Sequence, residues 1–201
     1  GSIREFRVGF FNIDAHWWQE SATPNTPKNV ARAVAYAKSL ALAGATDIGN
    51  AMDACANVPG THDLFLLSDG AATWGERDTV ALQTRVPEGC TIFAYRTGLE
   101  GTDTATLERL ARATGGAVFS VVGADALDAA ADAHTQRPWT IESVSGPGSD
   151  LLLDGRPTTL YPGQTLTATG RGGLDGPITL ALRQGERTLT VTAKADEVIK
   201  S

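Results

Sequence analysis

Short apolar runs and stretches with helical spacing of apolar residues alternate along the first two thirds of the chain. The clearest run, residues 64–67, stops just before Asp69-Gly70 and is typical of a buried parallel strand. The pattern predicts strands at residues 4–12, 15–18, 64–67, 91–95 and 117–122, and helices at residues 29–43, 47–57, 77–84, 104–114 and 124–133. Such alternation predicts an α/β fold with a mostly parallel sheet and helices on both faces.

Two local features refine the first part of this prediction. The short strand at residues 15–18 follows a tight turn, so we expect it to run antiparallel to the first strand at the edge of the sheet. Thr26-Pro27 is a helix start, because proline is well tolerated at the first helical position.

The pattern changes near Pro138. Short stretches rich in Thr, Leu and Val follow, separated by Gly, Pro and Asp turns, at residues 139–144, 151–153, 165–169, 178–183 and 188–193. They predict an antiparallel, β-sandwich-like segment over residues 138–201, distinct from the α/β part at residues 3–136. Alternation along these strands places seven side chains inward: Leu151, Leu153, Leu166, Ile178, Leu180, Leu189 and Val191.

Composition narrows the function classes. The 201 residues carry a formal net charge of −6, and no basic stripe is present to neutralise phosphates, which argues against nucleic acid as a partner. Cys55 and Cys90 belong to no CxxC or Cys/His cluster, so we expect buried free thiols rather than a zinc site. The three histidines are scattered and suggest no catalytic arrangement.

One pair of residues is a candidate site. Open α/β sheets bind ligands just outside the carboxyl ends of their strands, where Asp69 is expected. Thr46 lies in a loop that could reach the same edge. Taken singly, Asp69-Gly70 is more readily a turn after a strand and Thr46 a helix cap, and it is the pair in this order of elements that favours a site. We expect the two side chains to approach each other near Asn12 and the loop at residues 70–75.

The segment at residues 66–76 (Leu-Leu-Ser-Asp-Gly-Ala-Ala-Thr-Trp-Gly-Glu) resembles the strand and loop of von Willebrand factor type A domains. It is most similar to the version in inter-alpha-trypsin inhibitor heavy chains and their bacterial relatives. Further segments match that group in order: residues 10–12 with 22–24 and Asn29, residues 43–48 with 51–52, and residues 160–164 with 170–171. The resemblance implies a Rossmann-like sheet followed by a β segment, and favours an extracellular, cell-surface or periplasmic location.

The same resemblance implies a metal site. The family holds Mg²⁺ or Mn²⁺ at the top of the sheet, and its Thr and Asp ligands correspond here to Thr46 and Asp69. Oxygen ligands of this kind suit Mg²⁺ and leave an open coordination position. A carboxylate of a partner protein would complete the shell, with Asn12, Gly70 and Thr73 expected to contact that partner.

The chain also departs from the family. The Asp-x-Ser-x-Ser motif that supplies the remaining ligands does not occur, and neither does the strand expected between the second strand and the strand that carries Asp69. We therefore expect weak Mg²⁺ binding or none. Three arrangements would compensate for the strand: another chain supplies it, copies of the chain exchange elements in an oligomer, or the sheet closes around the gap.

The residues bear on three kinds of function: a binding module, a structural domain and an enzyme. The leading interpretation is an adhesion-type protein-binding module with an incomplete metal site. The alternative is a structural or assembly domain that needs no metal. An enzyme using Asp69 as a nucleophile would require further carboxylates or a lysine at neighbouring strand ends, and residues 95–98 (Tyr-Arg-Thr-Gly) offer neither. We therefore predict a protein that is not an enzyme.

Overall fold

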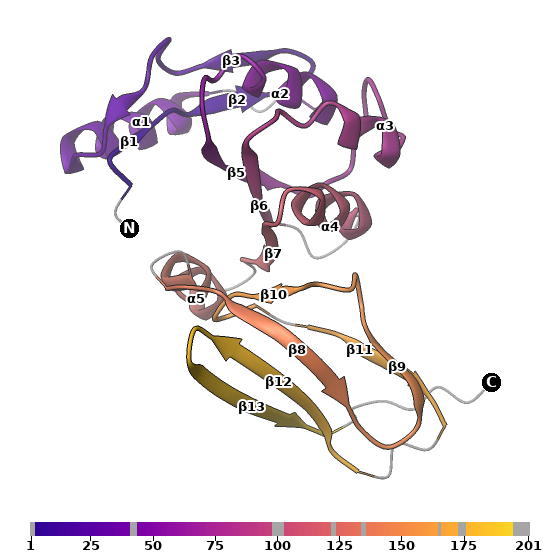
Figure 1. Cartoon of the computed structure of the whole chain (residues 1–201). Coiled ribbons are helices and arrows are strands. Elements are labelled where there is room, and N and C mark those ends of the chain that lie inside the picture. Colours follow the sequence, from indigo (N-terminus) through magenta and orange to yellow (C-terminus); the bar gives the residue numbers. More distant parts are fainter. Residues whose placement is uncertain are drawn as a thin grey trace.

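A three-stranded parallel sheet forms the centre of the α/β part (Figure 1). The structure, a computed structural model, describes residues 3–40, 44–97, 103–121, 124–133, 136–164, 166–172 and 176–194. The strands are β5 (His62–Ser68), β6 (Cys90–Arg96) and β7 (Ala117–Ser120), in that order across the sheet. In the parallel register Leu66 lies opposite Ala94, which lies opposite Val118. The predicted mixture of helices and parallel strands is thus confirmed.

Helices pack against this sheet because its side chains alternate between two apolar faces. On one face Ile92 and Ala94 meet α2 (Ile48–Cys55), α3 (Thr79–Thr84) and α4 (Thr104–Ala113) in one buried cluster. On the other face Phe93 packs with α5 (Ala124–Ala133). None of the described helices is long and apolar enough to cross a membrane.

Each of the first four helices begins at a side chain that accepts a hydrogen bond from the backbone N–H three residues later. Thr26 caps α1 (Pro27–Ser39), which confirms the predicted Thr-Pro start. Aspartates cap the next three helices: Asp47, Asp78 and Asp103. Both cysteines are buried and free, as predicted, and burial raises the pKa of the Cys90 thiol to about 11.

The N-terminal segment differs from the prediction of one strand over residues 4–12. It forms β1 (Glu5–Phe6), which pairs with β4 (Thr23–Pro24), and β2 (Gly9–Phe11), which pairs with β3 (Ala15–Trp17). The predicted antiparallel direction of β3 is confirmed, but neither strand pair joins the parallel sheet within the described residues. Ring contacts hold these pairs: Phe6 stacks on Trp18 and Phe10 on His16.

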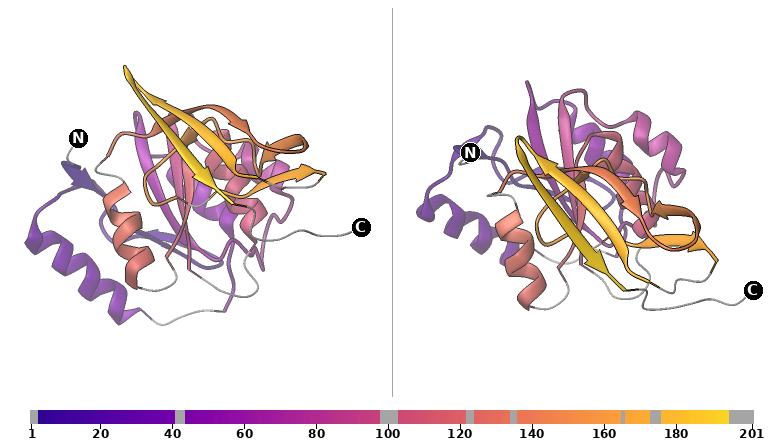
Figure 2. Two further views of the ribbon diagram at one scale, coloured as in Figure 1. Left: turned by 90° about the horizontal axis from the view of Figure 1, so that it is seen from below. Right: turned by 60° about the horizontal axis from the view of Figure 1, so that its bottom comes forward.

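The C-terminal part is antiparallel, as predicted (Figure 2). One sheet has the order β10-β8-β12-β13, formed by β10 (Thr159–Leu160), β8 (Trp139–Ser145), β12 (Ile178–Gln184) and β13 (Arg187–Ala193). A second pair joins β9 (Ser149–Leu153) and β11 (Ala168–Arg171). The change from helices to antiparallel strands lies between α5 and β8.

Two of the predicted inward-facing residues are exposed instead. Leu189 and Val191 each keep 43% of their surface accessible, because among the described strands β13 lies at the sheet edge and pairs with β12 alone. All seven residues of β13 are exposed. The buried side chain in this region is Leu182, opposite Leu189, so the alternation of apolar residues alone placed β13 wrongly in a core.

The contacts between the two parts include aromatic rings. Tyr161 follows β10 and packs edge-on against Phe93 and Phe119 of the parallel sheet. The turn at Gly163 also lies directly against α5, beside the backbone of Ala129. The antiparallel part therefore covers the same face of the parallel sheet as α5 does.

Candidate functional site

A cavity of about 260 Å³ lies at the carboxyl end of β5. Its lining combines hydroxyl groups, one carboxylate and two apolar side chains: Phe11, Thr46, Leu67, Ser68, Asp69 and Thr97. These residues come from β2, from the loop before α2, and from the ends of β5 and β6. Ligands of open α/β sheets bind at this edge, so the position of the cavity agrees with the expected site.

Thr46 is held in place by the loop that follows β5. Its backbone N–H donates to Thr73 Oγ1 (2.8 Å), and its carbonyl accepts from the N–H groups of Thr73 (3.0 Å) and Trp74 (3.1 Å). The loops are packed so closely that a Cβ at Gly75 would lie 2.2 Å from Asp47 Oδ2. The loop after β5 therefore fixes the backbone of Thr46, which lines the cavity.

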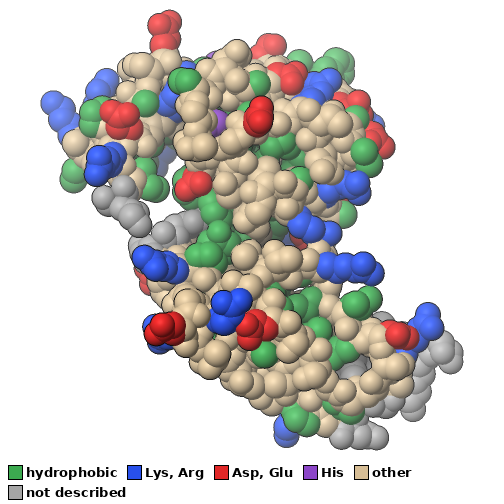
Figure 3. Space-filling model, in the orientation of Figure 1, with side chains coloured by type: hydrophobic (Ala, Val, Ile, Leu, Met, Phe, Trp, Pro, Cys, Tyr) green, Lys and Arg blue, Asp and Glu red, His purple; other side chains and the backbone are tan. Residues whose placement is uncertain are grey.

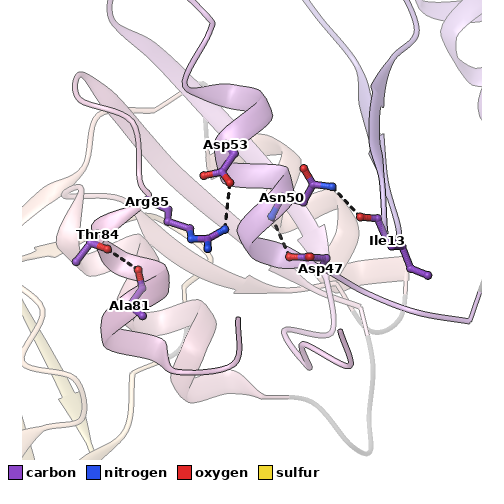
Figure 4. A network of polar contacts seen from close by, with 7 residues as sticks. All are labelled: Ile13, Asp47, Asn50, Asp53, Ala81, Thr84 and Arg85. Carbon is purple, nitrogen blue, oxygen red and sulfur yellow. Dashed lines mark hydrogen bonds and ion pairs between the residues drawn. The ribbon is translucent and has the colours of Figure 1, made fainter. Parts of the chain in front are cut away.

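Hydrogen bonds join the start of α2 to the turn after β2 (Figure 4). Asp47 Oδ1 accepts from the Asn50 N–H (2.9 Å), and Asn50 Nδ2 donates to the Ile13 carbonyl (2.7 Å). The Asp47 N–H also donates to the Asn12 carbonyl (2.7 Å). These bonds fix the backbone beside Thr46, so a ligand would meet a loop that is already ordered.

Asp69 is oriented by its own turn. Its Oδ1 accepts from the Ala71 N–H (3.1 Å), and its carbonyl accepts from the Asp103 N–H (2.9 Å) at the start of α4. The Gly70 N–H donates to Ser68 Oγ (3.1 Å). Within the described part of the chain, Asp69 Oδ2 has no hydrogen-bond partner, and the residue is exposed, so one carboxylate oxygen is available to a ligand.

The structure brings Thr46 and Asp69 to one cavity and places Thr73 beside Thr46. The other two predicted residues, Gly70 and Asn12, are not part of the cavity lining. Gly70 is buried, and a Cβ there would point at the Asp103 carbonyl. The Asn12 side chain accepts from the Asp14 N–H (2.9 Å) and does not line the cavity.

Sequence reasoning missed two hydroxyl groups of the cavity. Ser68 is 9% exposed and directly precedes Asp69 at the end of β5. Thr97 directly follows β6, which is the parallel neighbour of β5. The rule that the ends of adjacent parallel strands meet could have found Thr97, because residues 91–95 were already predicted as a strand.

The oxygen donors in the lining are of the type that a hard cation such as Mg²⁺ prefers, but they are few. Mg²⁺ prefers oxygen ligands and is held by one or two carboxylates together with waters. The cavity provides the Asp69 carboxylate and the hydroxyls of Thr46, Ser68 and Thr97. Among the described residues no group of three or more His, Cys, Asp or Glu side chains could hold a metal. The donors therefore fit Mg²⁺ as a weak ligand set with one carboxylate.

Comparison with known proteins adds no identification. No model of a protein family matches the sequence, and no curated protein matches it. Functional interpretation therefore depends on the residues of the site and on the fold that positions them.

Proposed function

We propose that this chain is a non-enzymatic protein-binding module of the von Willebrand factor type A kind. The observation that carries the proposal is the joint placement of Thr46 and Asp69 at the carboxyl edge of the sheet, in one open, hydroxyl-rich cavity. The sequence resemblance around residues 66–76 adds the family and an extracellular, cell-surface or periplasmic location.

In this proposal the site receives a carboxylate of a partner protein with the help of Mg²⁺. Asp69 Oδ2 and the Thr46 hydroxyl would hold the ion, and Ser68 and Thr97 would supply further oxygen donors in the same cavity. A bound ion would add positive charge beside Asp69, so that an acidic partner would be attracted. Thr73 lies at the rim beside Thr46, where a partner would touch it.

Calorimetry with Mg²⁺ tests the metal site. We expect the wild-type chain to bind with a dissociation constant on the order of 1 mM, because one carboxylate competes poorly with the hydration of the ion. Asp69→Asn removes the only charged ligand and should abolish the heat signal. The matched control Asp14→Asn changes an exposed carboxylate outside the cavity and should bind like the wild type. A micromolar constant, or equal binding by Asp69→Asn, would contradict this ligand set.

A second function, metal-independent assembly, is favoured by the free edge of the parallel sheet. β5 pairs with β6 on one side, and no described strand pairs with it on the other. On this edge strand Leu67 is 63% exposed. Unpaired edges of this kind recruit strands from other chains. We propose that a second copy of the chain adds a strand to β5.

Association of the chain tests this assembly. We expect light scattering to show a rise from monomer to dimer with increasing concentration. Leu67→Lys should keep the chain monomeric, because a lysine beside a sheet edge opposes strand addition. Leu152→Lys on β9, where the leucine is 45% exposed, is the matched control and should associate like the wild type. A wild-type chain that stays monomeric throughout would show that the β5 edge recruits no second copy.

A further inference from the structure

A second cavity, of about 390 Å³, lies at the opposite end of the parallel sheet. Its lining includes residues near the start of β5 and β6 and Tyr161 of the antiparallel part. Among the described lining residues are Asp63, Phe65, Phe93, Thr114 and Tyr161. On the face drawn in Figure 3, apolar side chains gather where the molecule narrows between its two parts. Ligand sites are frequent where two units of a protein meet.

Three aromatic residues that contact one another belong to the lining of this cavity. Phe65 and Phe93 are stacked neighbours in the parallel register, with ring centroids 5.8 Å apart and an interplanar angle of 24°. Tyr161 stands nearly perpendicular to Phe93, at 5.3 Å and 87°. Tyr161 is held by a further ring contact with Phe119 and by its N–H, which donates to Gln164 Oε1 (3.2 Å). The rings are therefore positioned before any ligand enters.

The charge of the cavity comes from Asp63. This carboxylate is exposed and forms no hydrogen bond or ion pair with any residue that the structure describes. Asp63 and Tyr161 line the same cavity, and burial and the charge of Asp63 both raise the pKa of the Tyr161 phenol. The Thr114 hydroxyl is already used, since it accepts from the Ile92 N–H and donates to the Ala111 carbonyl. None of the described residues that line the cavity is a Lys or an Arg.

We propose that this cavity binds a small organic cation of the quaternary ammonium class. A cation without N–H donors is attracted to the negative faces of aromatic rings, and the partly exposed rings of Phe65 and Tyr161 line the cavity beside the buried Phe93. The unpaired Asp63 carboxylate supplies the opposite charge at the same opening. An anion would be repelled by Asp63. The inference goes beyond the proposed protein-binding function, because Asp63 and Asp69 lie at opposite ends of β5.

Binding of choline, followed by NMR titration of the full chain, tests the inference. Its neutral isostere 3,3-dimethylbutan-1-ol has the same shape without the charge. We expect choline to bind saturably in the millimolar range and the isostere to bind about 2- to 30-fold more weakly, the span that cation–π contacts support. Shifts should map to residues around Phe65, Phe93 and Tyr161.

Variants measure the contributions of the rings and of the Asp63 charge to choline binding separately. Asp63→Asn and Tyr161→Leu should each weaken choline binding by about 2- to 30-fold. Tyr161→Phe keeps the ring and should bind choline like the wild type. Glu186→Gln, in the exposed turn before β13, matches the charge change of Asp63→Asn and should have no effect. Circular dichroism confirms folding of each variant. No saturable choline binding by the wild type, or equal binding of choline and its isostere, would overturn the proposal.

Discussion

Gly70→Ala is expected to lower the free energy of unfolding by about 2–5 kcal/mol. Two effects add. Gly70 has φ +79°, a left-handed conformation that costs an L-residue about 1–2 kcal/mol. A Cβ there would also lie 2.4 Å from the Asp103 carbonyl oxygen and 2.8 Å from Leu107 Cγ. The backbone oxygen cannot rotate away, so the start of α4 must move.

Gly115→Ala is the matched control for this variant. Gly115 has φ +76°, and nothing lies within 4 Å of its Cβ position. It should therefore lose only the conformational part, about 1–2 kcal/mol. Urea denaturation of both variants measures the difference. Equal losses for the two variants would show that the turn after Asp69 is not packed against α4 as described.

Leu107→Ala is expected to cost about 2–5 kcal/mol of unfolding free energy, the usual range for a fully buried leucine that leaves a cavity. Leu107 is 0% exposed and packs in the cluster that joins α2, α3 and α4 to the sheet. Leu127→Ala on α5 removes the same atoms from a side chain that is 56% exposed, and should change stability by less than about 0.5 kcal/mol.

The Leu107 variant also connects stability with the site. Asp103 caps α4 and donates its N–H to the Asp69 carbonyl, so a loosened α4 should disturb the turn that presents Asp69. We expect Leu107→Ala to weaken Mg²⁺ binding, whereas Leu127→Ala should leave it unchanged. A Leu107→Ala chain with wild-type stability would contradict the buried position of this residue.

The elements of the central sheet were predictable because their signals are local. The apolar run at residues 64–67 became β5, and residues 91–95 became β6 with one residue added at each end. Residues 124–133 formed α5 with the predicted bounds. In each case a periodic apolar pattern agrees with the flanking turn or cap residues, and such agreement specifies an element without knowledge of its neighbours.

Other features depend on which elements meet, and a local pattern does not contain that information. Residues 4–12 carry strand-like alternation, but β1 and β2 choose different partners. The alternation of β13 predicted a buried face, yet its position at a sheet edge leaves Leu189 and Val191 in water. The cavity between Asp63 and Tyr161 exists only because two parts of the chain pack together.

We propose above all that the sheet edge around Thr46 and Asp69 receives a carboxylate of a partner protein with the help of Mg²⁺. An NMR titration with acetate, which stands in for a partner's carboxylate, tests it most directly. With Mg²⁺ present, acetate should shift the amide signals of Thr46, Ser68, Asp69 and Thr97, and without Mg²⁺ or in Asp69→Asn it should not. Acetate shifts at these residues that are equal with and without Mg²⁺, or no shifts there in either condition, would contradict the account.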